Sequence, residues 1–212
     1  MHKVEEFQNK IGIRFSDEKL LLEALTHRSY INENAIWEVP HNERLEFLGD
    51  AVLELIITEN LFKRYPQEDE GKLTSVRAKL VNYIALAKVA YALEMEKYLF
   101  MSRGETKDTG RAREVILANA CEALIGAIYL DQGYETVAQF ILAHVFVNVD
   151  EILDKELFKD SKSYFQELAQ EHFKITPSYK VLDEQGPDHK KVFVVGVFLK
   201  DRKVAEGEGY SK

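Results

Sequence analysis

The feature that most constrains the fold of this chain is a change in hydrophobic periodicity near residue 155. Up to about residue 154, apolar residues recur three and four positions apart with few Gly or Pro interruptions, which is typical of amphipathic helices. This pattern predicts helices near residues 4–10, 17–27, 42–64, 70–80, 82–94, 113–131 and 134–154. Asp17 and Asn42 are candidate N-caps, and Pro66 and Gly133 are candidate stop signals.

The residues after Lys155 have the pattern of a small α-β-β-β unit. Residues 161–173 form one amphipathic helical segment. Three short runs rich in β-branched and aromatic residues follow it, at 179–182, 191–199 and 203–210, with turn residues at 185–189 and 200–203. We therefore predict an all-α domain over residues 1–155 and a small α+β domain over residues 160–212.

Composition favours a cytoplasmic protein. The single cysteine, Cys121, excludes an intramolecular disulfide and suits a reducing compartment. The N-terminus lacks the basic start and apolar run of a signal peptide. The longest nearly apolar stretch, residues 115–130, is shorter than a bilayer span and includes Asn119 and Glu122. We expect no contact with a membrane.

The net charge of −8 is unevenly divided between the two parts of the chain. Residues 1–154 contain 17 basic and 26 acidic residues, whereas residues 155–212 contain 11 and 10. An acidic domain is a poor partner for nucleic acid, because phosphates are bound by Lys and Arg. It can still act on phosphates if its carboxylates hold divalent cations, which reverse the local field.

An acidic stripe is predicted on the helix over residues 42–64. On a helical projection, four carboxylates fall within one arc of about 80°: Glu43, Glu46, Asp50 and Glu54. The apolar residues opposite would face the core: Leu45, Leu48, Val52, Leu55 and Ile56. A solvated face is the commoner reading of such a stripe, but a divalent cation would also offset the repulsion between like charges. Phe47 lies at the edge of the acidic arc, and an aromatic ring there suggests a contact with another protein.

Glu122 is the one ionisable acid in the apolar segment 115–130. A helix that is apolar on nearly all sides is buried, and a buried carboxylate must be paired, protonated or bound to metal. Asn119, one turn earlier, offers a carbonyl oxygen. Pairing with a core arginine such as Arg77 is an equally good account from this segment alone.

The residue types favour Mg²⁺ or Mn²⁺ over other metals. Carboxylates on two helices, without His or Cys among them, are hard oxygen ligands of the kind that these cations prefer. A di-iron helical bundle would show Glu-x-x-His on two helices. No two helices of the predicted helical domain carry this motif.

Five sequence blocks resemble those of bacterial ribonuclease III, in the same order. HNERLEFLGD at 41–50 resembles the signature of that family letter for letter, and it is joined by LTHRSY at 25–30, EGKLTSVRA at 70–78, SRGE at 102–105 and EALIGAIYLD at 122–131. The C-terminal part, with QELAQ at 166–170 and GPDHKK at 186–191, resembles a double-stranded-RNA-binding domain. The resemblance covers nearly the whole chain.

The resemblance implies a homodimeric, Mg²⁺-dependent endonuclease that cuts double-stranded RNA and leaves 5′-phosphate and 3′-hydroxyl ends, with Mn²⁺ able to replace Mg²⁺. It implies metal ligands at Glu46, Asp50, Asn119 and Glu122, of which Asp50 and Glu122 are catalytic, with Glu43 and Glu70 as supporting acids. Phe47 resembles the ring that this family inserts into the partner subunit. The implied substrates are precursors of ribosomal RNA, with messenger and transfer RNA also processed.

The resemblance also implies a set of RNA-binding residues in the C-terminal domain: Ser163, Gln166, Glu167, Gln170, His189, Lys190 and Lys212. The first four would touch 2′-hydroxyls in one minor groove, and His189 would reach the next. For Gln166 and Gln170, an ordinary exposed helix face is the alternative.

The chain departs from the family pattern in two places. Asn119 stands where the family usually has Asp, which removes one formal charge from the site. The chain also ends at Lys212, where the family's RNA-binding domain continues with a lysine-rich helix, so we expect that helix to be missing. These departures leave a second reading open, a dimeric double-stranded-RNA-binding relative with weakened cleavage.

Overall fold

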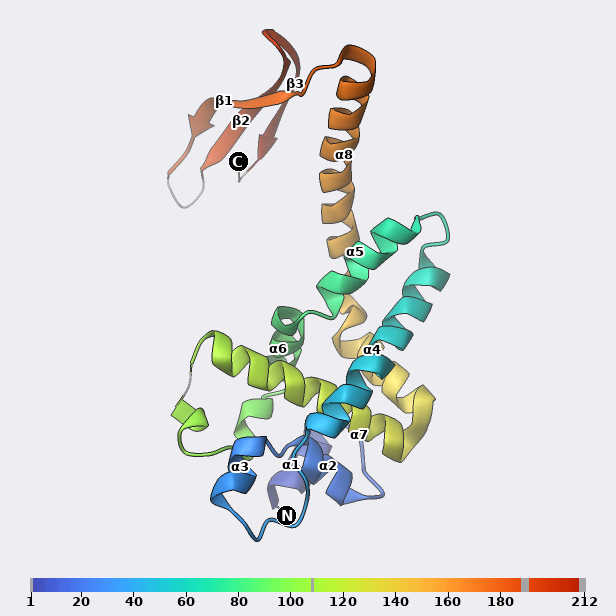
Figure 1. The fold of residues 1–212 in the computed structure, drawn as a ribbon, viewed down its shortest axis with the longest axis vertical. Coiled ribbons are helices and arrows are strands. Elements are labelled where there is room, and N and C mark those ends of the chain that lie inside the picture. The colour runs from blue at the N-terminus through green and yellow to red at the C-terminus, as the bar shows by residue number, and fades with distance from the viewer. Residues whose placement is uncertain (1, 108, 188–190, 210–212) are drawn as a thin grey trace. The chain divides into compact units, whose positions relative to one another are not determined.

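The computed structural model describes residues 2–107, 109–187 and 191–209 (Figure 1). The chain divides into two compact units, Met1–Leu153 and Asp154–Lys212. Helix α8 (Val149–Phe173) begins in the first unit and continues into the second. The predicted junction near residues 155–160 therefore has a helical backbone.

The first unit consists of helices with short connections. These are α1 (His2–Ile11), α2 (Glu18–Ala24), α3 (Arg28–Glu33), α4 (Glu43–Arg64), α5 (Glu70–Leu80), α6 (Tyr83–Ala92) and α7 (Arg111–His144), with 3-10 turns η1 (Met95–Lys97), η2 (Glu105–Lys107) and η3 (Phe146–Asn148). The predicted all-α class is confirmed, and α4 and α5 begin and end within one residue of the predicted bounds. No helix among the described residues is long and apolar enough to cross a membrane.

The predicted helix over residues 17–27 is in fact two helices. The side chain of Asp17 caps α2 as predicted by accepting a hydrogen bond from the backbone N–H of Lys19. The chain then leaves the helix, because Thr26 forms a bridge with Phe100 that draws it toward a distant segment. His27 caps the following helix, α3, by accepting from the backbone N–H of Ser29.

Asn42 lies before α4 as predicted, but its side chain does not cap the helix. The Asn42 amide donates to the carbonyl oxygen of Ala24 at 3.4 Å, and its backbone N–H donates to that of Thr26 at 2.9 Å. Asn42 is buried, so these bonds satisfy groups that water cannot reach. The first turn of α4 is thereby attached to the connection between α2 and α3.

The two helices predicted at 113–131 and 134–154 differ from the observed ones. Gly133 interrupts the helical geometry of α7 with φ of 79° and ψ of −175°, so the predicted break occurs there as a kink. A positive φ is easily adopted by glycine, which has no Cβ. The real end of the helix comes later, at His144, before η3 and α8.

Helices α4 and α7 lie at the centre of the first unit, with the other helices around them (Figure 1). Both contribute fully buried side chains to the core: Leu53, Ile56, Ile57 and Leu61 from α4, and Leu117, Leu124, Ile125 and Ile128 from α7. Leu55, which the helical projection placed toward the core, is 58% exposed, and that prediction is wrong. The neighbouring helices therefore cover only part of the apolar face that the helical projection of α4 predicts.

The second unit contains the end of α8 and a three-stranded antiparallel sheet. Its strands β1 (Ser178–Gln185), β2 (Val192–Leu199) and β3 (Arg202–Gly209) follow the order β1-β2-β3. In the register, Val195 of β2 pairs with Val181 of β1 and Gly207 of β3. The predicted α-β-β-β construction is confirmed over the described residues.

Candidate active site

The candidate site lies where α4 and α7 cross, and two glycines make that crossing possible. A Cβ at Gly49 would lie 1.8 Å from the carbonyl oxygen of Glu122, and one at Gly126 would lie 2.3 Å from that of Leu45. The backbones of the two helices are therefore in direct contact at these two positions, where no side chain would fit. Side chains near these glycines, Glu46 and Asp50 on α4 and Glu122 on α7, are brought close together.

Sequence analysis missed the role of these two glycines. A glycine inside a helix costs about 1 kcal/mol relative to alanine, so its presence points to a packing or functional reason. Gly49 and Gly126 both lie inside long helices, and this signal was available in the sequence. What the sequence did not reveal is that the two positions meet.

The carboxylates at the crossing are close enough to change one another's pKa values. Burial raises the pKa of Glu122 to about 7, and the negative charges of Asp50 and Glu46 add to this effect. The pKa of Glu46 is also raised, first by burial and then by Glu43 and Asp50, while a hydrogen bond with Asn119 opposes the shift. All the charged groups that shift these two pKa values are themselves acids.

This donor set fits a divalent cation. A cation would relieve the repulsion among Glu46, Asp50 and Glu122, and carboxylate and amide oxygens are its usual hard ligands. The neighbouring thiol of Cys121 is buried, which raises its pKa to about 12 and keeps it protonated. Within the part of the chain that the structure describes, no three His, Cys, Asp or Glu side chains have the geometry of an already formed metal site. The acids interact, but among the described residues their oxygen atoms are not arranged around a single metal position.

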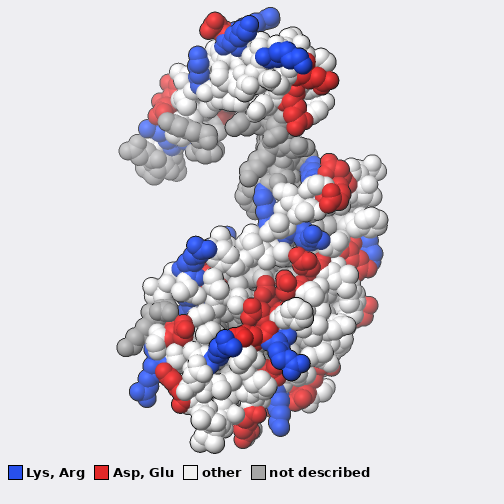
Figure 2. Space-filling view, viewed as in Figure 1, with Lys and Arg blue, Asp and Glu red and all other residues white. Residues whose placement is uncertain are grey.

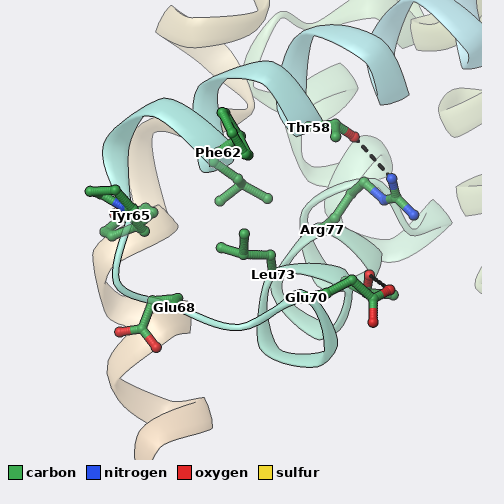
Figure 3. Close-up of a pocket in the computed structure, with 10 residues that line it drawn as sticks. Thr58, Phe62, Tyr65, Glu68, Glu70, Leu73 and Arg77 are labelled. Atoms are coloured by element: carbon green, nitrogen blue, oxygen red, sulfur yellow. Dashed lines mark hydrogen bonds between the residues drawn. The ribbon is translucent and has the colours of Figure 1, made fainter.

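The alternative partner for Glu122, Arg77, is engaged elsewhere. Its guanidinium donates to the hydroxyl of Thr58 on α4 at 2.9 Å (Figure 3). No ion pair between Arg77 and Glu122 occurs among the described residues. The core ion pair that the sequence left open is therefore not formed.

Glu70, a predicted supporting acid, lies at a different place on the molecule. Its carboxylate accepts a hydrogen bond from the hydroxyl of Thr74 at 3.2 Å. Glu70 and Arg77 line a cavity of about 510 Å³ between α5 and the second half of α4, together with Phe62 and Leu73 (Figure 3). Among the described groups, Glu70 is not one of those that shift the pKa of Glu46 or Glu122. Within one chain, Glu70 is therefore not part of the group formed by Glu46, Asp50 and Glu122.

Glu43, the other predicted supporting acid, lies on the first turn of α4 between two basic side chains. Its carboxylate is 3.3 Å from Nε of Arg28 and 3.8 Å from Nδ1 of His41. Its charge reaches the acid group, since Glu43 is the charged residue that most raises the pKa of Glu46. Glu43 thus links the acids of the crossing to a cluster that the sequence did not predict.

Exposed apolar side chains lie on α4 beside the acids. Phe47 is 82% exposed, in agreement with the predicted surface position of its ring. Leu55 and Phe62 further along the helix are 58% and 72% exposed. Such a row of uncovered apolar side chains on one helix is typical of a protein–protein contact.

In the second unit, the predicted RNA-contacting side chains that are described lie together on the surface. Gln166, Glu167 and Gln170 are exposed and line a shallow hollow of about 370 Å³ with Thr176. The hydroxyl of Thr176 donates to the side-chain oxygen of Gln170 at 3.3 Å, which orients that amide. The side chain of Ser163, and His189, Lys190 and Lys212, lie outside the described residues.

Comparison with known proteins gives matches over both units. Residues 17–149 match the family model described as ribonuclease-III-like, and residues 161–212 match that of the double-stranded RNA binding motif. The chain is 46% identical to ribonuclease 3 of a Nitratiruptor species over 215 residues, covering 100% of this chain and 91% of the relative. It is 44% identical to ribonuclease 3 of Desulforamulus reducens, covering 99% and 85%.

Among solved structures, the first unit resembles the nuclease domain of ribonuclease III from Campylobacter jejuni. The TM-score is 0.60 at 39% identity, covering 67% of this chain and 95% of that one. That structure is described for flexibility in a region involved in dimer formation.

Proposed function

Since the chain belongs to the ribonuclease III family and is an endoribonuclease, we propose that it cuts double-stranded RNA with Mg²⁺ held at the crossing of α4 and α7. The observation that supports this most is the meeting of Glu46, Asp50 and Glu122 at the crossing, where the pKa values of Glu46 and Glu122 are raised. Every charged group that shifts these two pKa values is another acid. Oxygen donors on two helices fit Mg²⁺ and also Mn²⁺, whereas a protonated buried thiol argues against a softer metal.

In this proposal, Glu46, Asp50, Asn119 and Glu122 hold the cation. When bound, a divalent cation lowers the pKa of a nearby water molecule and stabilises charge on a phosphate. Glu122 must first release the proton that it holds up to about pH 7. The amide of Asn119 holds the carboxylate of Glu46 through a hydrogen bond.

Asp50 and Glu122 are the proposed catalytic residues. They orient a water molecule whose oxygen attacks the phosphorus of the RNA backbone, and a carboxylate takes up the proton that the water loses. The bond from phosphorus to the 3′ oxygen breaks, and that oxygen gains a proton. The products are a 3′-hydroxyl end and a 5′-phosphate end.

A second copy of the chain is the proposed partner for the apolar row on α4. Phe47, Leu55 and Phe62 are largely uncovered in the single chain. A homodimer would bury them and place two acid groups in one assembly. Glu70, which does not shift the pKa of Glu46 or Glu122 in its own chain, would then be available to the acids of the partner.

The second unit is the proposed docking module for the RNA duplex. The exposed amides of Gln166 and Gln170, with the carboxylate of Glu167, can exchange hydrogen bonds with 2′-hydroxyls across a minor groove. This contact distinguishes RNA from DNA. We place the activity in the cytoplasm, on precursor ribosomal RNA and other structured RNAs.

A substrate comparison tests the proposal. Purified protein should cut a long perfect RNA duplex in Mg²⁺, while single-stranded RNA and duplex DNA of the same sequence stay intact. The new 5′ ends should accept label from a kinase only after phosphatase treatment. Inertness toward the duplex over a wide range of Mg²⁺ and Mn²⁺, with retained binding, would instead support the weakened RNA-binding relative.

A further inference from the structure

Two sequence blocks without a role in the proposed chemistry, residues 25–30 and 102–105, meet at the start of α4. The backbone N–H of His27 donates to the carbonyl of Phe100 at 2.9 Å, and that of Ser102 donates to the hydroxyl of Ser29 at 3.0 Å. Asn42 joins the same place through its bond to Thr26. The surroundings of Arg28 are thus fixed by three separate segments.

Within this cluster, Glu43 has two basic neighbours but is bonded closely to only one. Nε of Arg28 lies 3.3 Å from one carboxylate oxygen, which is ion-pair distance. Nδ1 of His41 lies 3.8 Å from the other oxygen, which is too long for a hydrogen bond.

Nδ1 of His41 is a buried polar atom that lacks a hydrogen bond among the described residues. Nδ1 is closed off from water and has no hydrogen-bond partner among the residues that the structure describes. A buried donor left unpaired is unfavourable, so the present arrangement is incomplete. A small rotation of Glu43 toward His41 would bring its carboxylate within hydrogen-bond distance of Nδ1, which could then donate to it.

Arg28 is well placed to meet an anion from solution. Its side chain is 62% exposed although it touches Glu43. On the face over which α4 passes, a band of acidic side chains is bordered by Lys and Arg side chains (Figure 2). An RNA backbone that approaches acidic ligands is repelled by them, so cations at the border of the acids would favour its binding.

We propose that Arg28 binds a backbone phosphate of the RNA duplex beside the cutting site, and that Glu43 occupies Arg28 until RNA arrives. The phosphate displaces the Glu43 carboxylate, which turns to Nδ1 of His41. Arg28 is therefore kept in place by an internal anion in the free protein. This inference rests on the proposed function and adds to it an RNA contact in the nuclease domain.

The test is binding of a labelled RNA duplex in EDTA, which allows no cleavage, between about 50 and 200 mM salt. Arg28→Gln should make the slope of log binding constant against log salt concentration shallower by somewhat under one unit. When the salt concentration rises fourfold, the variant should therefore lose roughly threefold less affinity than the wild type loses. Arg28→Lys should retain the steeper dependence. Lys88→Ala, which removes an exposed cation on α6, is the matched control.

A double-mutant comparison tests the exchange at Glu43. Glu43→Gln should raise RNA affinity more in the chain that keeps Arg28 than in the Arg28→Gln chain. Glu54→Gln, at another exposed acid on α4, measures the general effect of removing a negative charge and should act equally in both. Circular dichroism checks that each variant is folded.

An unchanged salt dependence for Arg28→Gln, or equal effects of Glu43→Gln in the two chains, would overturn this inference. Those results would leave the proposed function intact if the wild type still cuts duplex RNA in Mg²⁺. A wild type that neither binds nor cuts the duplex would instead overturn the proposed function itself.

Discussion

At the scale of single residues, Glu122 shows why the site needs a cation. An acid whose pKa rises on folding binds its proton more tightly in the folded chain than in the unfolded one. Its stabilising contribution is therefore present at low pH and is lost as the pH rises from 4.5, the ordinary value, to about 7. Above that pH the folded protein holds an ionised carboxylate against Asp50 and Glu46.

We predict that Glu122→Gln removes this pH dependence and abolishes cutting. In EDTA, the wild type should lose thermal stability between pH 5 and pH 8, whereas the variant should change less and be at least as stable at pH 8. Thermal unfolding followed by circular dichroism measures this, with Glu54→Gln as the control for a surface acid. A variant that unfolds at both pH values would indicate a structural role for the carboxylate.

Asn119 gives a second prediction at this scale. Its amide bonds to Glu46, and replacement by Asp exchanges that neutral ligand for a charged one. Asn119→Asp should lower the Mg²⁺ concentration needed for half-maximal cleavage, since a carboxylate is the stronger ligand. In EDTA the same variant should be less stable than the wild type, because one more negative charge faces the others. A raised or unchanged Mg²⁺ requirement would show that the site depends on the amide.

At the scale of elements, the α4–α7 crossing should be very sensitive to added atoms. Gly49→Ala or Gly126→Ala would push a methyl group into the carbonyl of the other helix. We expect a loss of about 3 kcal/mol or more, the upper end for overpacking, because a backbone atom cannot move aside as a side chain does. Urea unfolding measures it. Gly104→Ala, where a Cβ would lie in ordinary contact with the hydroxyl of Ser102 at 3.7 Å, should be nearly neutral.

The exposed side of α4 gives the prediction for assembly. Phe47→Ala should weaken self-association, since burying a Phe side chain stabilises by roughly 1.5–3 kcal/mol. Sedimentation at low micromolar concentration should show a shift toward monomer. Ile36→Ala removes another exposed apolar side chain, 97% exposed and outside α4, and should leave association unchanged. If Phe47→Ala also had no effect, the ring would not belong to the interface.

At the scale of the whole molecule, periodicity predicted the elements but not the contacts between them. The bounds of α4 and α5 follow from local sequence, because caps and breaks are local. The division of residues 17–33 into α2 and α3 depends on the bridge from Thr26 to Phe100, which no local pattern reveals. The position of Leu55 was wrong for a related reason, since a helical projection does not show how much of an apolar arc the neighbouring helices cover.

The site was predictable only in part. Acids on one face of α4 and a lone acid in an apolar helix indicated a cation site, but spacing alone did not exclude a solvated face or an ion pair with Arg77. Glu46, Asp50 and Glu122 come together because Gly49 and Gly126 allow α4 and α7 to pack closely. That contact joins two segments that are distant in sequence, so local sequence patterns do not predict it. The placement of Glu43 between Arg28 and His41 has the same origin, because three distant segments create it.

We claim above all that the acids at the α4–α7 crossing hold a divalent cation for RNA cleavage, and one assay tests this. The cleavage rate of a long RNA duplex is measured across a Mg²⁺ titration for the wild type and Glu122→Gln, with EDTA as the zero point. We predict cutting by the wild type that rises with Mg²⁺ and stops in EDTA, and no cutting by the folded variant at any concentration. Wild-type cutting in excess EDTA, or undiminished cutting by Glu122→Gln, would contradict the claim.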